Sequence, residues 1–110
     1  MSVLQLHGKA DDTILYDGGE IDGRPYTSAA ETVALWRRAD DCPGDSRPGA
    51  RLDADANVAG DDLWPTLWTH CRGDTEVALW TIAPGSHVPA LTPAFTAALV
   101  DWFEAHQRAR

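Results

Sequence analysis

Two stretches of this chain share one pattern: Val3-Leu4-Gln5-Leu6-His7-Gly8-Lys9-Ala10-Asp11 and Val77-Ala78-Leu79-Trp80-Thr81-Ile82-Ala83-Pro84-Gly85-Ser86-His87. Each begins with a run of mostly apolar residues, breaks at a glycine and then presents a side chain that can exchange a proton. Apolar runs that do not alternate with polar residues are typical of strands buried on both faces, which occur in parallel sheets covered by helices. The two stretches therefore predict an α/β fold.

The proton-exchanging side chains that end these stretches are Asp11 and His87. In open α/β sheets the ligand crevice lies outside the carboxyl ends of the strands, so we expect both side chains at one edge of the fold. A carboxylate that orients an imidazole, and an imidazole that takes a proton from a nucleophile, are two members of a Ser-His-Asp relay. The pair is a candidate for acid-base chemistry, although turn and capping roles explain an aspartate after a strand equally well.

The nucleophile of such a relay is not found by its usual motif. The chain contains no G-x-S-x-G, the strand-to-helix turn that exposes the serine of α/β-hydrolases. The nearest stretch, Gly-Asp-Ser-Arg-Pro-Gly at residues 44–49, has one residue too many and lies in a Pro-rich loop. The residues predict an acid and a base without their serine.

Length and charge restrict the class of protein. The 110 residues allow one domain, and the net charge of −8, from 17 acidic and 9 basic residues, argues against a nucleic-acid partner and an anionic membrane surface. No apolar run approaches the length of a membrane span, and the chain starts without a signal peptide. We expect neither a nucleic-acid partner nor a membrane segment.

The two cysteines, Cys42 and Cys71, lack the C-x-x-C spacing of a zinc ribbon. They either form one bridge that closes a loop of about 30 residues or remain as two buried thiols. The polar, turn-rich sequence around both favours the bridge.

Capping residues predict two helices. Ser28 begins the first, which carries Val33 and Trp36 toward the core and stops by Asp40. The second begins at Thr92, with Pro93 in its first position, and an apolar stripe follows at helical spacing: Phe95, Ala98, Leu99, Trp102 and Phe103.

The middle of the chain predicts fewer elements. Residues 64–71 alternate as a half-exposed strand, and the turn at residues 72–74 makes this strand an antiparallel neighbour of residues 77–83. Residues 43–62 indicate a loop with at most a short strand at 50–55. With about four strands and two main helices, the helices can cover the two faces of the sheet but one edge strand stays without a partner. The residues therefore predict a piece of a larger sheet or a protomer that pairs through its open edge.

Several segments, taken in order, resemble the polyhydroxybutyrate depolymerase and feruloyl esterase-like family of secreted α/β-hydrolases. The resemblance covers almost all of the chain and only the C-terminal part of the family's domain. It is carried by His7-Gly8-Lys9-Ala10-Asp11, Ile14-Leu15-Tyr16-Asp17-Gly18-Gly19, Trp36, Cys42, Cys71, Val77-Ala78-Leu79-Trp80, Gly85-Ser86-His87, Trp102-Phe103 and His106. Val88-Pro89 stands where the family has Thr-Trp-Pro.

The resemblance implies a single partial domain at residues 1–110, extracellular, with Asp11 as the triad aspartate and His87 as the triad histidine. It implies hydrolysis of a carboxylic ester, with no cofactor and no metal, once an N-terminal part supplies the serine and the oxyanion hole. The alternative is a noncatalytic remnant or interaction module of the same fold. Self-association or a partner chain at the open sheet edge fits either hypothesis.

Two further hypotheses concern the surroundings of the relay. Tyr16, Trp64 and Trp68 are candidates for an aromatic substrate pocket, although core or rim packing explains such side chains more often. A metal site drawn from His7, Asp11, Asp12, His70 and His87 is a weaker alternative, because no pair of these histidines has the spacing of a ligand motif. His7 is expected to pack its ring under the loop that follows it.

Overall fold

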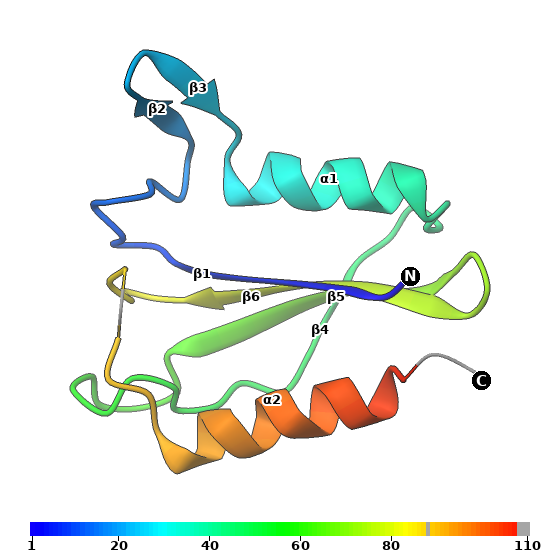
Figure 1. Ribbon diagram of the computed structural model, residues 1–110. Helices are drawn as coiled ribbons and strands as arrows, with labels where there is room; N and C mark the ends of the chain where they lie inside the picture. Colours follow the sequence, from blue (N-terminus) through cyan, green and yellow to red (C-terminus); the bar gives the residue numbers. More distant parts are fainter. Residues whose placement is uncertain (88, 108–110) are drawn as a thin grey trace.

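The computed structural model describes residues 1–87 and 89–107, and Val88 of the sequence comparison above lies outside them. The main sheet has four strands in the order β1-β6-β5-β4, in which β1 and β6 are parallel and the other pairs antiparallel (Figure 1). The elements are β1 (Val3–Gly8), β2 (Gly19–Ile21), β3 (Arg24–Tyr26), α1 (Ala29–Ala39), β4 (Arg47–Pro48), β5 (Leu63–Cys71), β6 (Thr75–Ile82) and α2 (Pro93–Ala105).

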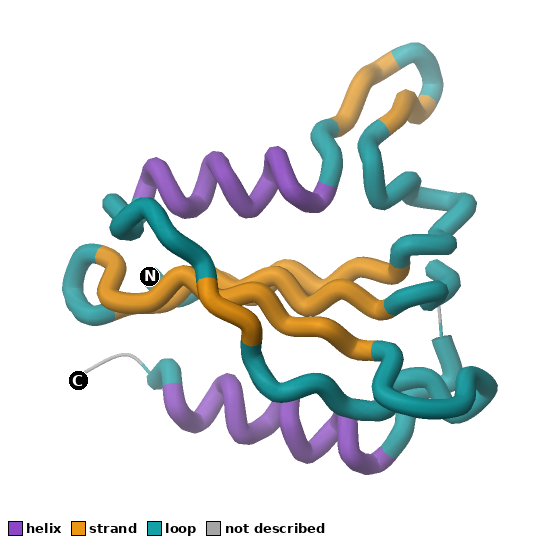
Figure 2. Tube along the Cα trace, turned by 180° about the vertical axis from the view of Figure 1, so that it is seen from behind, coloured by secondary structure: helices purple, strands orange, loops and turns teal. Residues whose placement is uncertain are grey.

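The two helices lie on opposite faces of this sheet, α1 on one and α2 on the other (Figures 1 and 2). The strand β6 shows why, because all its residues from Val77 to Ile82 are buried. Val77 and Leu79 pack in the cluster under α1, whereas Trp80 and Ile82 pack with Phe95 of α2. The expected mixed α/β arrangement of four strands and two helices is confirmed at this level.

Both helices begin at the expected caps. The Ser28 hydroxyl accepts a hydrogen bond from the Glu31 amide at 3.0 Å, and the Thr92 hydroxyl accepts one from the Phe95 amide at 3.1 Å. Each bond satisfies one of the amides that a helix start leaves without a partner. The first helix ends at Ala39 with Asp40 as its C-cap, as expected.

Residues 43–62 form mainly a loop, as expected, and residues 50–55 make only isolated bridges, at Leu52 and Asp55. The two-residue strand β4 lies before them, at Arg47–Pro48. The antiparallel ribbon β2–β3 was not foreseen, and it projects beside the N-terminal end of α1 (Figure 1). The turn composition of residues 17–26 concealed these three-residue strands.

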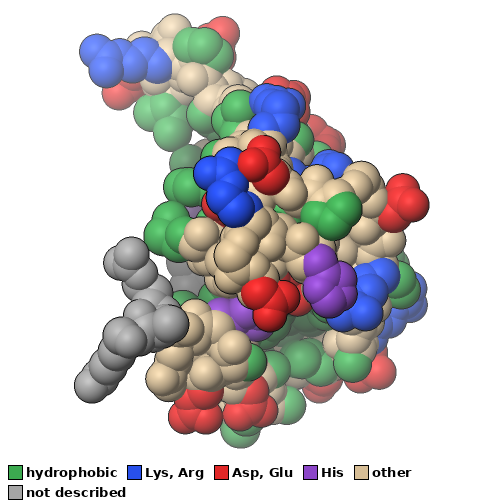
Figure 3. Space-filling view, turned by 90° about the vertical axis from the view of Figure 1, so that its right-hand side faces the viewer, with side chains coloured by type: hydrophobic (Ala, Val, Ile, Leu, Met, Phe, Trp, Pro, Cys, Tyr) green, Lys and Arg blue, Asp and Glu red, His purple; other side chains and the backbone are tan. Residues whose placement is uncertain are grey.

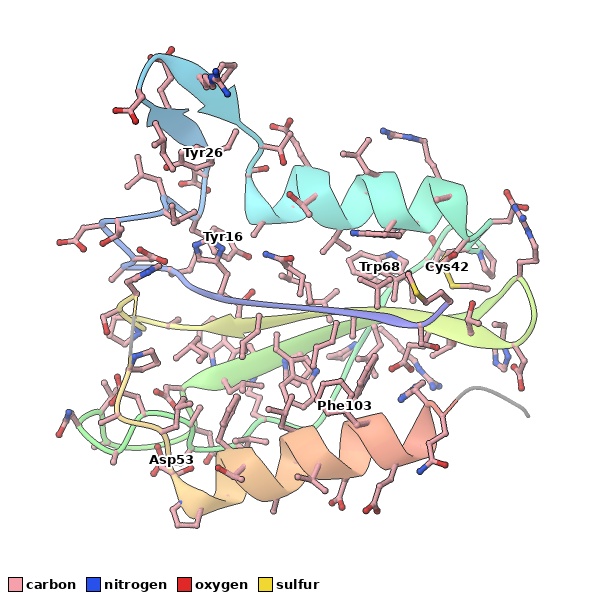
Figure 4. The ribbon with its side chains drawn as sticks, viewed as in Figure 1. Tyr16, Tyr26, Cys42, Asp53, Trp68 and Phe103 are labelled. Atoms are coloured by element: carbon pink, nitrogen blue, oxygen red, sulfur yellow. A yellow bond between two sulfur atoms is a disulfide. The ribbon has the colours of Figure 1, made fainter. Side chains whose placement is uncertain are left out.

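The cysteines form the expected disulfide, Cys42–Cys71, across a sequence separation of 29 residues. It joins the loop after α1 to the last residue of β5. Figure 4 shows Cys42 beside Trp68 at the C-terminal end of α1. Neither helix of the described residues is long and apolar enough to cross a membrane.

Candidate functional site

Asp11 and His87 meet at the end of the sheet where β1 and β6 finish. The Oδ2 atom of Asp11 lies 2.9 Å from Nδ1 of His87, although 76 positions separate them in the chain. Asp11 is buried, whereas 46% of the His87 side chain is exposed. The carboxylate is therefore protected from solvent and the imidazole is open to a ligand.

Backbone contacts between the two loops bring this pair together. The Lys9 amide donates to the Ile82 carbonyl at 2.8 Å, and the Ala10 amide donates to the Gly85 carbonyl at 2.9 Å, so the parallel pairing of β1 and β6 continues into both loops. Gly8 lies directly against Gly85, and a Cβ on Gly8 would overlap the Gly85 carbonyl oxygen. Gly85 also has φ of +35°, a left-handed conformation that favours glycine. Both glycines permit the close approach of the loops.

The Asp11 carboxylate accepts hydrogen bonds on both oxygens. Its Oδ1 accepts the amides of Thr13 and Ile14, each at 2.9 Å, and its Oδ2 faces His87. Burial acts to raise the pKa of Asp11, but the hydrogen bond with His87, the two amides and the attraction of His87 together outweigh it and lower the pKa to about 2. Asp11 is consequently ionised at neutral pH and can only accept protons in these bonds.

A groove of about 430 Å³ opens beside this pair. Its walls come from the end of β1, the turn after Asp11 and the segment after β6, and they are mainly apolar, with contributions from Leu6, Ile14, Ile82, Pro89 and Leu91. His87 and Ser86 line it as well. Within the described residues, Nε2 of His87 has no hydrogen-bond partner. The arrangement places an oriented imidazole, with a free nitrogen, at the wall of an apolar groove.

The three aromatic candidates do not converge on this groove. Tyr16 packs under α1 and its hydroxyl lies 2.9 Å from Oγ1 of Thr81. Trp68 packs at the other end of the same layer, with the Arg37 guanidinium 4.6 Å from its ring centre (Figure 4). Trp64 is exposed on β5 and donates its Nε1–H to a loop carbonyl. Packing roles describe all three, and none of them lines the groove.

The residues of the metal hypothesis are only partly brought together. His7 and His87 both contact Oδ2 of Asp11, but Asp12 is exposed and His70 lies at the far end of β5, next to Asp74. Figure 3 views that far end, where acidic, basic and histidine side chains are interspersed. The described part of the chain contains no group of three or more side chains arranged to hold a metal ion.

The sequence did not reveal the apolar walls of the groove. Leu6 belongs to a run that was interpreted as buried, yet it is 37% exposed, and Leu91 is 47% exposed. The only feature of the sequence that indicated their exposure is that each leucine lies close to a glycine or a proline in a loop. His7 takes the expected place under its loop, with its Nε2 2.7 Å from the Ile14 carbonyl.

Comparisons of this chain with protein-family models, with curated proteins and with solved structures found no match.

Proposed function

We propose that this chain contributes the aspartate and histidine of a Ser-His-Asp triad, and that it hydrolyses carboxylic esters together with a segment outside the 110 residues that supplies the serine. The observation that carries the proposal is the 2.9 Å contact between the ionised, buried carboxylate of Asp11 and Nδ1 of the exposed His87. The sequence resemblance to polyhydroxybutyrate depolymerases and feruloyl esterases supports the same reading.

The chemistry follows from which atoms hold protons. Because the Asp11 carboxylate only accepts, Nδ1 of His87 must carry the proton of their hydrogen bond, which leaves Nε2 as a base. In the proposed reaction Nε2 takes the proton of a serine hydroxyl as its oxygen bonds to the ester carbonyl. The same proton then goes to the leaving alcohol, and an acyl-serine forms. A water molecule then gives a proton to Nε2 as its oxygen bonds to the acyl carbon. The bond between that carbon and the serine oxygen breaks, Nε2 returns the proton to the serine oxygen, and the acid is released.

The difference between the two edges of the sheet indicates where the proposed serine-bearing segment would bind. Free strand edges attract other strands, and proteins protect them with short strands, charges and proline. The outer edge strand β4 is protected in this way, because it consists only of Arg47 and Pro48. The other edge, β1, is six residues long and contains neither proline nor a Lys, Arg, Asp or Glu. Within the described residues β1 pairs only with β6.

The position of β1 fits such a partner, because Asp11, His87 and the groove all lie at its carboxyl end. A strand added along β1 reaches this end, and the exposed Leu6 and Leu91 offer it apolar contacts. The net charge of −8 opposes pairing with a second copy of this chain. We therefore assign the β1 edge to the segment that carries the serine.

The lining of the groove suits an ester with an apolar acyl group. Aliphatic side chains from β1, from the turn after Asp11 and from the segment before α2 surround His87, whereas no described charged side chain other than Asp11 lines the groove. Hydroxyalkanoate, ferulate and acetate esters all present such a group to an apolar wall. The disulfide Cys42–Cys71 is consistent with an oxidising, extracellular compartment.

Fusion to a serine-bearing half tests the proposal. The N-terminal half of a polyhydroxybutyrate depolymerase-like esterase, joined by a flexible linker before Met1, should hydrolyse a short-chain 4-nitrophenyl ester. His87→Ala should abolish this activity, and Asp11→Asn should lower kcat by about 10⁴ because it favours the wrong imidazole tautomer. The matched control is Asp12→Asn, which changes an exposed neighbour. Ester hydrolysis that survives His87→Ala in the folded fusion contradicts a triad role for His87. The alternative hypothesis, a noncatalytic interaction module, would then be favoured for this chain.

A further inference from the structure

We propose that His7 is a positioning residue for this site: its ring fixes the turn of residues 11–14 and thereby aims the Asp11 carboxylate at His87. The catalytic part of this inference rests on the proposed function. The positioning part rests on contacts of the described residues and can be tested without a serine.

A single ring nitrogen of His7 lies between the two ends of the turn. Its Nε2 is 2.7 Å from the carbonyl oxygen of Ile14 and 3.3 Å from Oδ2 of Asp11. A carbonyl oxygen can only accept, so Nε2 carries a hydrogen and His7 donates it. Because Asp11 is ionised, its nearby oxygen is a second acceptor for the same N–H. The ring bridges the start and the end of the turn.

Ile14 is consequently held from two sides. Its amide donates to Oδ1 of Asp11 at 2.9 Å, and its carbonyl accepts from His7. The Thr13 amide donates to the same Oδ1 atom. With both amides on Oδ1, the other oxygen, Oδ2, faces Nδ1 of His87 at 2.9 Å and Nε2 of His7 at 3.3 Å. Loss of the His7 contact would release the Ile14 carbonyl, and the amide of the same residue would no longer be fixed on Asp11.

The ring itself is fixed by its surroundings. Tyr16 packs against it edge-on, with ring centres 5.5 Å apart and ring planes at 83°. The Tyr16 hydroxyl lies 2.9 Å from Oγ1 of Thr81, and Thr81 is the β6 residue paired with His7 across the parallel strands. Only 10% of the His7 side chain is exposed. The turn is thereby tied to β1 and β6, the two strands that precede Asp11 and His87 in the chain.

Three substitutions of His7 separate positioning from packing. The side-chain amide of His7→Gln reaches the place of Nε2 and can donate to Ile14. The side chain of His7→Leu fills the volume without a donor, and His7→Asn carries a donor that is too short. The readouts are the Asp11 pKa from carboxyl ¹³C chemical shifts, and the hydrogen exchange of the Thr13 and Ile14 amides, in the isolated disulfide-bonded chain.

In the His7→Gln variant the Asp11 pKa should stay lowered, at about 2, as in the wild type measured beside it. His7→Leu and His7→Asn should raise it toward the ordinary value of about 3.9, and should speed exchange of the two amides by about tenfold. An Asp11 pKa that stays near 2 in a folded His7→Leu or His7→Asn protein overturns the inference. If neither of these variants folds, the His7→Gln variant provides the test. An Asp11 pKa close to the ordinary value of about 3.9 in that variant also overturns the positioning role of His7.

The active fusion adds a kinetic test. There, His7→Leu should lower kcat by at least tenfold with little change in KM, and His7→Gln should restore most of the loss. An inactive wild-type fusion contradicts the proposed function and leaves the Asp11 and amide readouts valid. Equal kcat in all variants, with the wild type active, shows that His7 only packs.

Discussion

Gly8 and Gly85 lie with their backbones in direct contact, where the two strands of the site end. A Cβ on Gly8 would overlap the carbonyl group of Gly85 and the carbonyl oxygen of Ser86, and these backbone atoms cannot rotate away as the end of a flexible side chain can. The contact is what allows the chain after β1 and the chain after β6 to converge. The position of Asp11 relative to His87 depends on a residue that has no side chain.

Gly8→Ala should therefore damage both stability and the site. We expect a loss of about 1 to 3 kcal/mol in the free energy of unfolding, since the loops must move apart. Urea unfolding measures the free energy of unfolding. The carboxyl ¹³C chemical shift of Asp11 reports whether Asp11 and His87 have moved apart. Gly44→Ala is the matched control, because a Cβ there meets nothing within 4 Å and its φ is not left-handed. Equal stability of the two variants would contradict the close approach.

Asp11 should make the chain sensitive to acid. Its pKa is lowered in the folded state to about 2, below its ordinary value of about 3.9 in an unfolded chain. A carboxyl group with a depressed folded pKa contributes stability above the unfolded value, and this contribution is lost as the pH falls through the folded value. The loss attributable to Asp11 should therefore fall between about pH 5 and pH 2.

Comparison with Asp11→Asn isolates this effect. Urea midpoints of the wild type and the variant should differ most at pH 5 and converge toward pH 2. Asp12→Asn, at an exposed position, should follow the wild type throughout. A difference between wild type and Asp11→Asn that is constant over this range would show that Asp11 does not titrate with a lowered pKa.

The disulfide should contribute a large part of the stability of so small a chain. Its 29-residue separation predicts about 3 to 4 kcal/mol from restriction of the unfolded chain. The double variant Cys42→Ala/Cys71→Ala should lose that amount in urea unfolding, and reduction of the wild type should reproduce it. Reduction that leaves the urea midpoint unchanged would be inconsistent with a structural bridge.

The second helix offers a pair of phenylalanines with opposite expectations. Phe95 is 2% exposed in the cluster with Trp80, whereas Phe103 is 59% exposed. Phe95→Ala should cost about 3 to 5 kcal/mol, and Phe103→Ala no more than about 0.5 kcal/mol. Thermal unfolding of both variants tests which side of α2 packs on the sheet. A larger loss for Phe103→Ala would place the packed stripe on the other side.

The difference between these phenylalanines shows where sequence reasoning stops. The caps at Ser28 and Thr92, the hairpin between β5 and β6 and the burial of β6 follow from local chemistry and periodicity, and they were predicted correctly. Helical spacing predicts which side of a helix is apolar, but it does not predict which residues at the border of that side are buried. Phe103 and Trp36 were assigned to the apolar stripes that face the core, and they are 59% and 38% exposed.

The candidate site, like the fold, could be predicted only in part from the sequence. The glycine breaks after two apolar runs predicted that Asp11 and His87 would lie at one edge, and the structure brings them into contact. The bridging position of His7 between Ile14 and Asp11 could not be derived, because it depends on how the turn closes and not on spacing. The separate locations of Tyr16, Trp64 and Trp68 likewise depend on which side chains face each helix.

The contrast between the two sheet edges also limits how copies of this chain can assemble. A sheet grows into a fibre only when each added molecule presents a fresh edge to the next. Here Arg47 and Pro48 protect the outer side of the sheet beside Thr66 and Leu67 of β5, so two molecules that meet through β1 leave only this partly protected side facing outward. We expect such an encounter to stop at a pair, and it would compete with the proposed serine-bearing segment for the same strand.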